Sequence, residues 1–406
     1  MTSERDADLI VVGGGPAGVM AGLLFARSGC DVRILEKHAD FFRDFRGDTV
    51  HPSTMEILDQ LGMLQRFLQR SHNRVDRAQL RLAGRDWTIG DLSHLNTPAP
   101  FIAMMPQWDF LDFLRAEGKA FPGFHLEMEA PVEGFVEEGG RVVGVRLRNG
   151  RELRAPLTIA ADGRASIVRQ ILPVEDLGAP IDVFWFRIAK PEKERGALRG
   201  NVESGRVLVM IDRGDYWQCA FVIPKGAAEA YQARGIDAIR EEVAAAAPAE
   251  LNVAELDEIT DLHLLSVKLD RLTSWHKPGL LAIGDAAHAM SPIGGIGINL
   301  AIQDAVAAAN ALAGSLARGE DIDPLLHAVQ DRRLFPTRVI QGVQKAAQDR
   351  VIGRVLQSTA PIRQAPLVVR LLDRFPLLRR IPGRIIGLGV RRERVRSPAA
   401  PVPRTP

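Results

Sequence analysis

Residues 8–18 read DLIVVGGGPAG: an apolar run, three successive glycines, and a proline that opens a helix-forming stretch. The segment carries the pattern G-x-G-x-x-G at Gly13, Gly15 and Gly18. Glycines in these positions let the backbone turn tightly and approach a pyrophosphate, and the first amides of the following helix point toward the anion. A second apolar strand, residues 31–35, leads to Glu36, where a carboxylate can bind ribose hydroxyls. The stretch therefore predicts a strand–helix–strand unit that binds a dinucleotide.

Composition indicates an ordinary globular protein with one large or two medium domains. The chain has 406 residues, 46% of them hydrophobic and 25% charged. Two scattered cysteines, Cys30 and Cys219, make neither a disulfide framework nor a metal site. The sequence has no apolar run of 18 residues and no secretory leader, so we expect a cytoplasmic protein without a bound metal or a nucleic-acid partner.

Two further motifs follow apolar strands. Residues 283–299 read IGDAAHAMSPIGGIGIN, an acid after a strand, then a glycine-rich loop and a long helix. The acid can accept hydrogen bonds from a polyol chain, and the helix N-terminus presents a positive dipole end to an electron-rich ring. Residues 161–166 read ADGRAS and also follow a strand, although an Asp-Gly corner alone is typical of an ordinary turn.

Together the three motifs resemble the group A flavoprotein monooxygenases, the family of para-hydroxybenzoate hydroxylase and the ubiquinone-pathway hydroxylases. The resemblance runs from about Asp8 to about Ala317. It implies FAD as cofactor, with NAD(P)H as a transient reductant, and hydroxylation of an aromatic or lipophilic small molecule by O2 through a flavin C4a-hydroperoxide. The flavin carries this chemistry, so no catalytic side chain is assigned, and His288 is interpreted as a structural residue of its loop. A single dinucleotide fingerprint agrees with nicotinamide that binds only transiently.

The resemblance also implies where the cofactor binds. The ADP half would lie against the glycine motif and the end of the second strand, and the ring against the loop before the long helix. The expected cofactor-binding residues are Gly13, Gly15, Pro16, Ala17, Gly18, Glu36, Lys37, Arg46, Gln107, Asp162, Gly163, Asp285, Pro292, Gly295, Gly297, Ile298 and Asn299. Arg46 and Arg164 could instead be surface salt-bridge partners.

The expected fold is α/β + β: a Rossmann-like FAD-binding domain, an inserted and mostly antiparallel substrate sheet, and C-terminal helices. The FAD-binding domain is predicted in three pieces, 1–70, 108–172 and 276–360. The substrate domain is predicted from 71–107 and 173–275. Phe186 and Met210 are candidate substrate contacts on this sheet, although ordinary core packing suits both.

The activity that this fold supports stays open at this stage. The same fold hosts flavin-dependent halogenases and isoprenoid-chain reductases, and a non-catalytic FAD-binding protein is a further alternative. Trp217 and Ile223-Pro224 only partly match the Trp-x-Trp-x-Ile-Pro stretch of the halogenases.

The end of the chain is strongly basic. Residues 361–406 carry 11 arginines against Asp373 and Glu393. The predicted helical segment 361–396 could contact an anionic membrane, but a docking helix with a solvated basic face is the simpler interpretation. Residues 397–406, rich in proline, are predicted to be disordered.

Overall fold

The computed structural model describes residues 5–42, 49–190, 198–203, 205–248, 251–358, 360 and 362–401. Its first sheet is built around strand β1 (Leu9–Val12), in the order β20-β21-β12-β1-β2-β8. All neighbouring pairs except β20–β21 are parallel. The other strands are β2 (Val32–Leu35), β8 (Phe124–Glu127), β12 (Leu157–Ala160), β20 (His276–Lys277) and β21 (Leu280–Ala282). Strands far apart in the sequence thus end at one edge of a mostly parallel sheet.

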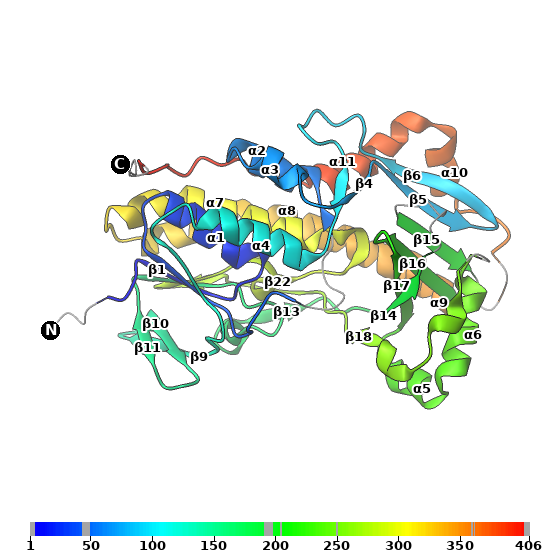
Figure 1. The fold of residues 1–406 in the computed structure, drawn as a ribbon, viewed down its shortest axis with the longest axis horizontal. Helices are drawn as coiled ribbons and strands as arrows, with labels where there is room; N and C mark the ends of the chain where they lie inside the picture. Colours follow the sequence, from blue (N-terminus) through cyan, green and yellow to red (C-terminus); the bar gives the residue numbers. More distant parts are fainter. Residues whose placement is uncertain are drawn as a thin grey trace.

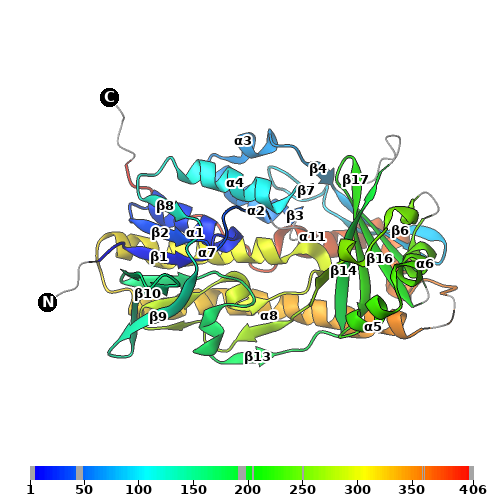
Figure 2. The same ribbon diagram turned by 60° about the horizontal axis from the view of Figure 1, so that its bottom comes forward.

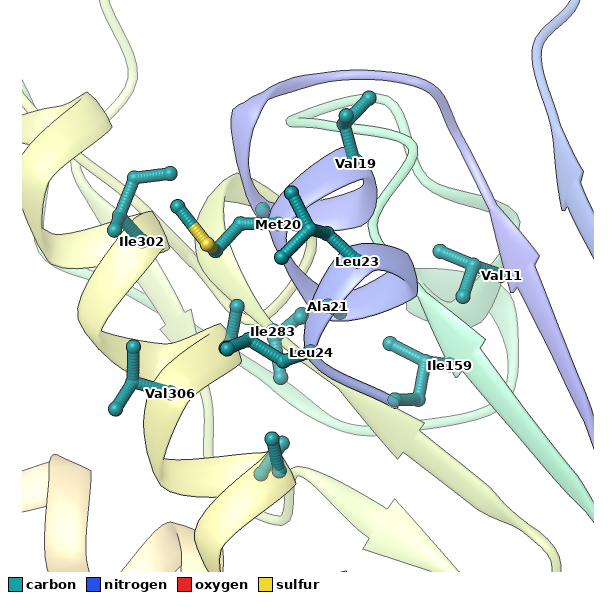
Figure 3. Packing of buried hydrophobic residues seen from close by; sticks show 14 of the residues in the cluster. Val11, Val19, Met20, Ala21, Leu23, Leu24, Ile159, Ile283, Ile302 and Val306 are labelled. Carbon is teal, nitrogen blue, oxygen red and sulfur yellow. The ribbon is translucent and has the colours of Figure 1, made fainter. Parts of the chain in front are cut away.

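Helix α1 (Pro16–Arg27) packs between this sheet and helix α7 (Gly297–Ala317) (Figure 3). Proline at the first position suits the helix start, because its missing N–H would have no intrahelical partner there. Ser28 is the C-cap of α1, and Gly29 follows it in a left-handed conformation with φ of +96°. Side chains of α1, among them Leu23 and Leu24, are fully buried. This packing holds the glycine turn that precedes α1 against the strand ends.

The second sheet is mostly antiparallel and lies at the opposite end of the molecule (Figure 1), in the order β18-β14-β17-β16-β15-β5-β6. Its strands are β5 (Arg77–Leu82), β6 (Arg85–Asp91), β14 (Ile181–Ala189), β15 (Leu198–Glu203), β16 (Arg206–Asp212), β17 (Tyr216–Pro224) and β18 (His263–Leu265). Helices α5 (Ala228–Ala233) and α6 (Ile236–Ala246) cover one face. The α/β + β architecture expected from the sequence is confirmed.

The remaining strands form three smaller sheets. They are β11-β10-β9, β13-β19-β22 and β3-β7-β4. Their members are β3 (Thr49–Val50), β4 (Asn73–Val75), β7 (Ile102–Met104), β9 (Val132–Glu138), β10 (Arg141–Leu147), β11 (Glu152–Arg154), β13 (Val174–Asp176), β19 (Asp270–Leu272) and β22 (His288–Ala289). The remaining helices before α7 are α2 (Pro52–Gln60), α3 (Leu64–Leu68) and α4 (Gln107–Gly118).

Helix α8 runs along much of the long axis (Figure 2) and connects the two ends of the molecule. It spans Leu326–Ala347, continues as a π-helical turn over Gln348–Ile352, and ends in α9 (Gly353–Gln357). Two shorter helices follow, α10 (Leu367–Arg374) and α11 (Arg380–Leu388). Ile352, Val355 and Leu356 pack on the second sheet.

The tail after α11 differs from the expectation of disorder. Ser397 is buried and its amide donates to Asn310 Oδ1 at 2.8 Å, while the Ala400 amide donates to the Arg27 carbonyl at 2.8 Å. Residues 397–401 are therefore fixed by backbone hydrogen bonds that a composition argument does not reveal. Residues 402–406 lie outside the described residues.

Among the described residues, one helical stretch, Ile293–Ala317, is long and apolar enough to cross a membrane. Most of its apolar window, 78%, is buried inside the protein. This stretch is α7 with the turn before it, so its apolar character is explained by its place in the core.

Candidate functional site

The three sequence motifs meet at one edge of the first sheet. Strand β1 pairs in parallel with β12, and β12 pairs in parallel with β21, so their carboxyl ends are adjacent. Gly13, Ala161 and Ile283 are the residues that follow these three strands. In open α/β sheets, ligands bind outside the carboxyl ends of the strands. The sequence-based expectation that the motifs share one site therefore has a structural basis.

The glycines of the first motif serve two different purposes. Gly13 has φ of +105°, and a side chain there would collide with the backbone of Ala161 and Asp162. A side chain on Gly18 would collide with the Gly13 carbonyl. In contrast, a Cβ on Gly15 would meet no atom within 4 Å. Packing thus requires two of the glycines, and the third faces open space at the N-terminus of α1, where Pro16 and Ala17 begin the helix.

Glu36 is held at the end of β2 by two backbone amides. Its Oε2 accepts a hydrogen bond from Gly14 N at 2.8 Å, and its Oε1 accepts one from His38 N at 3.1 Å. The side chain is 8% exposed, so the carboxylate is oriented beside the glycine turn before any ligand arrives. The adjacent Lys37 is exposed.

Arginines connect the second and third motifs. Arg164 Nη2 lies 3.3 Å from Asp285 Oδ2, and Arg169 Nη2 donates to the Asp285 carbonyl at 2.8 Å. Arg169 also pairs with Asp270 at 2.8 Å. Arg164 is therefore an ion-pair partner, as the simpler interpretation held, but its partner is the acid of the second motif.

Asp162 is the titratable group most affected by its surroundings at this edge. Burial raises the pKa of its carboxyl, and this effect outweighs hydrogen bonds from Ser166 and the Ile167 amide and the nearby charge of Lys37. Its Oδ1 is buried and has no partner among the described residues, and the same holds for Arg164 Nη1. Gly163 follows with φ of +85° and open space at its Cβ position.

The glycine loop before α7 is held by a hydrogen bond at its C-terminal end. Gly294 and Gly295 have φ of +79° and +61°, conformations that favour glycine. Thr49 Oγ1 donates to the Gly295 carbonyl at 2.8 Å. Pro292 precedes the two glycines, and Gly297 and Ile298 begin α7.

The side chain of Asn299 is fully used in holding this loop. Its Oδ1 accepts from His51 N at 2.9 Å and from Thr54 Oγ1 at 2.7 Å. Its Nδ2 lies 3.2 Å from the Thr49 carbonyl and 3.3 Å from the Gly295 carbonyl. A ring-binding role for Asn299 would therefore fall to its backbone.

Two other residues, Gln107 and Arg46, were expected to bind the cofactor and remain predictions. Gln107 is the first residue of α4 and is half-buried. Arg46 lies outside the described residues.

His288 belongs to a buried charge network behind the site. Its Nε2 lies 2.6 Å from Asp304 Oδ2, and Arg333 Nε lies 2.8 Å from Asp304 Oδ1. All three side chains are at most 1% exposed. Burial raises the pKa of the Asp304 carboxyl, but the charges and hydrogen bonds of His288 and Arg333 outweigh it and hold this pKa below its usual range. His288 is thus enclosed in the core, as a structural residue would be.

The structure places the two candidate substrate contacts in the core of the second sheet, the alternative that the sequence analysis also gave for both. Phe186 and Met210 are fully buried in a cluster with Ile239 and Val243 of α6. Side chains alternate along a strand, so these residues lie on the face of the sheet that α5 and α6 cover. Trp185 lies on the other face and packs with residues from β7, β16 and α11.

Local chemistry at the three strand ends fits FAD. The open space at Gly15 gives room for a pyrophosphate beside helix amides, and Glu36 is placed for a ribose. The unpartnered polar atoms of Asp162 and Arg164 point to a polar ligand, because buried polar groups are normally hydrogen-bonded. Within the described ranges, no group of three His, Cys, Asp or Glu side chains could hold a metal ion.

Several residues of the site were missed by sequence reasoning. Thr49, Asp304 and Arg333 are distant in sequence from the motifs, and each lies in an unremarkable strand or helix pattern. The importance of Asp304 and Arg333 is seen only in the three-dimensional structure, where both charged side chains are fully buried.

Comparison with known proteins shows the family of the chain. The model of the FAD binding domain family matches residues 6–343. A curated relative, 6-methylpretetramide 4-monooxygenase of Streptomyces rimosus, is 34% identical over 96% of this chain and 94% of its own. Against some other curated monooxygenases the chain spans about 62% of the relative's length.

Solved structures share the fold. p-Nitrophenol 4-monooxygenase from Pseudomonas putida superposes with a TM-score of 0.73 at 19% identity, covering 94% of this chain and 95% of its own. The flavin-dependent brominase Bmp2 superposes with a TM-score of 0.74 at 17% identity, covering 94% and 93%. The fold alone therefore does not distinguish a hydroxylase from a halogenase.

Proposed function

This chain belongs to the FAD-dependent monooxygenases of the FAD binding domain family, and we propose that it hydroxylates a fused-ring phenol with NAD(P)H and O2. The observation that carries the proposal is that Gly15, Asp162 and Asp285 lie at one edge of the first sheet, where the Arg164 side chain contacts Asp285. FAD bound there would supply electron transfer from NAD(P)H and the activation of O2.

Protein groups would bind and orient the cofactor. The amides after Gly15 and the carboxylate of Glu36 would hold its ADP half, and Asp162 and Asp285 its polyol and phosphates. The loop from Pro292 to Gly297 would place the N-terminus of the 21-residue helix α7 toward the ring. The positive end of that helix would favour negative charge on a ring bound there.

A large apolar substrate suits the face of the second sheet that carries Trp185. Residues from β4, β7, β15, β16 and α11 and from the segment after β6, including Met104, Leu95 and Leu388, form an apolar cluster with it. Met104 is paired with Thr49, which holds the Gly295 loop. The indole Nε1 of Trp185 is buried without a partner in the described part of the chain, so it could donate to a substrate oxygen. The similarity to 6-methylpretetramide 4-monooxygenase supports a polycyclic substrate.

NAD(P)H oxidation by the FAD-loaded protein tests this function. We expect a fused-ring phenol to accelerate NAD(P)H oxidation and to gain one oxygen atom from isotopically labelled O2. Gly15→Val, in which we expect weakened FAD binding, is the control. If neither NADH nor NADPH ever reduced the flavin, a halogenase served by a separate reductase, or a non-catalytic FAD-binding protein, would replace the proposal.

Trp185→Phe tests the substrate face and keeps most of the side-chain volume. We expect KM for the substrate to rise with little change in the unfolding free energy. Phe186→Leu, on the face covered by α6, is the matched control, for which we expect the reverse. Equal KM values in both variants would contradict the assignment of the face.

We further propose a cytoplasmic protein that contacts anionic membranes through α10 and the start of α11. Half of the large exposed hydrophobic residues of the described chain lie between Leu367 and Ile381. Leu367, Val368 and Leu377 are each more than 60% exposed. Arg363, Arg370, Arg374, Arg380 and Arg384 are exposed among them. Apolar and basic side chains on one exposed surface suit an anionic membrane better than a second copy of the same basic surface.

Sedimentation with vesicles checks this contact. We expect binding to phosphatidylglycerol vesicles and not to phosphatidylcholine vesicles, with loss on raising the salt concentration. The variant Leu367→Ser with Leu377→Ser should lose binding, whereas Phe335→Ser, on the exposed side of α8, should keep it. Equal sedimentation of all three proteins would contradict the contact.

A further inference from the structure

Helix α8 and the π-helical turn that extends it bury polar side chains where a helix of a globular protein normally buries apolar ones. Five polar residues at helical spacing are at most 1% exposed: Arg333, Thr337, Gln341, Gln344 and Gln348. On the outer side, Phe335 and Val343 are 57% and 50% exposed. Burial of polar groups is unfavourable unless they are hydrogen-bonded, so the inward side must have a specific partner.

Two of the three glutamines, Gln344 and Gln348, bind the segment that leads into the glycine loop, and Gln341 binds the strands just before it. Gln341 Nε2 donates to the Asp270 carbonyl of β19 at 2.8 Å and lies 3.2 Å from the Ala289 carbonyl of β22. Gln344 Nε2 donates to the carbonyls of Ser291 and Ile293, both at 3.0 Å, and its Oε1 lies 3.2 Å from the Ser291 amide. Gln348 Nε2 donates to Ser291 Oγ at 2.8 Å.

These bonds replace those of a neighbouring strand. β22 ends at Ala289, and within the described part of the chain no strand pairs with the residues that follow it. A glutamine side chain has both a donor and an acceptor, so Gln344 pairs with an amide and two carbonyls, as a strand would. The segment from Ser291 to Ile293 therefore takes its position from α8.

We propose that Gln344, assisted by Gln348, is a positioning residue that sets the conformation of the Pro292–Gly295 loop and thereby the surroundings of the flavin. The proposal rests on the FAD site inferred above. The loop is held at its end by Thr49 and Asn299 and at its beginning by these glutamines, so Pro292 and Gly294 lie between two anchors. Loss of the first anchor leaves three backbone groups near Pro292 without partners.

Gln348 occupies a second informative position. It is the first residue of the π-helical turn, a feature that is frequent at functional sites. Its Oε1 is buried without a partner in the described part of the chain. The same turn continues into Ile352, which packs on the substrate sheet, so one helix contacts both the loop and the sheet.

The test compares two glutamines of one helix. Gln344→Leu removes the bonds to the loop. Gln330→Leu is the matched control, because Gln330 makes two similar bonds to Trp275 N and the Thr273 carbonyl, away from the loop. Full-length protein is titrated with FAD, and the dissociation constant, the visible spectrum of bound flavin and its midpoint potential are measured beside urea unfolding.

We expect Gln344→Leu to raise the FAD dissociation constant by on the order of tenfold over the control, the equivalent of one buried backbone group without its partner. The flavin spectrum and midpoint potential should change as well. Gln348→Met removes a single hydrogen bond and should leave the protein folded. It should change the FAD dissociation constant, the flavin spectrum and the midpoint potential in the same direction as Gln344→Leu, but by less. The conservative variant Gln344→Glu retains only the acceptor for Ser291 N and should not restore the wild-type potential.

Equal effects of Gln344→Leu and Gln330→Leu on affinity, spectrum and potential would overturn the positioning role while leaving the FAD site intact. Failure of the wild-type chain to bind FAD would instead remove the site, and the positioning role with it.

Discussion

Replacement of Asp304 by leucine should destabilise the protein strongly, because its carboxylate is the centre of a buried network of charged groups. It accepts from His288 Nε2 at 2.6 Å, from Arg333 Nε at 2.8 Å and from the Gly284 amide at 3.0 Å. Asp304 and Arg333 are both fully buried. In Asp304→Leu, Arg333 keeps only Glu393, at 3.3 Å, as an acidic partner.

The expected loss follows from that geometry. Removing one partner of a buried ion pair costs about 3–5 kcal/mol, since the other charge stays buried. An exposed pair such as Arg148–Glu133, at 2.8 Å, contributes about 0–1 kcal/mol. We therefore expect Asp304→Leu to cost several times more than Glu133→Gln in unfolding free energy.

Urea unfolding followed by circular dichroism measures both variants at a fixed FAD concentration, because bound ligand adds to apparent stability. The double variant Asp304→Leu with Arg333→Met should cost less than the sum of the single variants, since it removes both buried charges. A loss below about 1 kcal/mol for Asp304→Leu, or strict additivity in the double variant, would refute the reasoning.

Three other results should follow from the structure. Gly15→Val should lower the unfolding free energy by at most about 1 kcal/mol, yet weaken FAD binding at least roughly tenfold in a fluorescence titration. Gly18→Val should prevent folding, because a side chain there collides with the backbone. Similar behaviour of the two variants would contradict the different surroundings of the two glycines. Phe186→Ala should lower the unfolding free energy by about 3–5 kcal/mol and leave substrate preference unchanged, which turnover of a phenol panel would check. Burial lowers the pKa of His51 to about 4, so the unfolded state binds one more proton between pH 6.5 and pH 4, and the unfolding free energy should fall by up to about 3 kcal/mol as the pH is lowered through that range. His51→Gln should reduce this pH dependence, and unchanged dependence would contradict the assignment.

The parts of the fold that were predictable are those with local signals. Gly13 to Gly18 and residues 283–299 carry glycine patterns whose backbone requirements can be read in one dimension. Strand alternation also predicted strands of the second sheet and placed Phe186 and Trp185 on opposite faces, but it could not show which face is covered by helices. That choice depends on α5 and α6, which lie later in the chain.

The supports of the site had no local signal. The glutamines of α8 look like ordinary surface residues until the helix is seen with its polar side inward. The order in Ser397–Ala400 likewise depends on contacts with α1 and α7, more than 80 residues away, and proline content alone predicts the opposite.

The pairing of β1 also has a consequence for synthesis of the chain. Its partner β12 follows at residue 157, and β21 completes that side of the sheet at residue 282. At ~5–20 residues per second, the ribosome needs roughly 15–55 s to deliver these strands after β1. Until then the apolar side chains of α1 have no α7 to cover them, so nascent chains should depend on chaperones. Chains that stop before Glu393 would contain every strand but lack the acid that pairs with Arg333, and proteases should remove them preferentially.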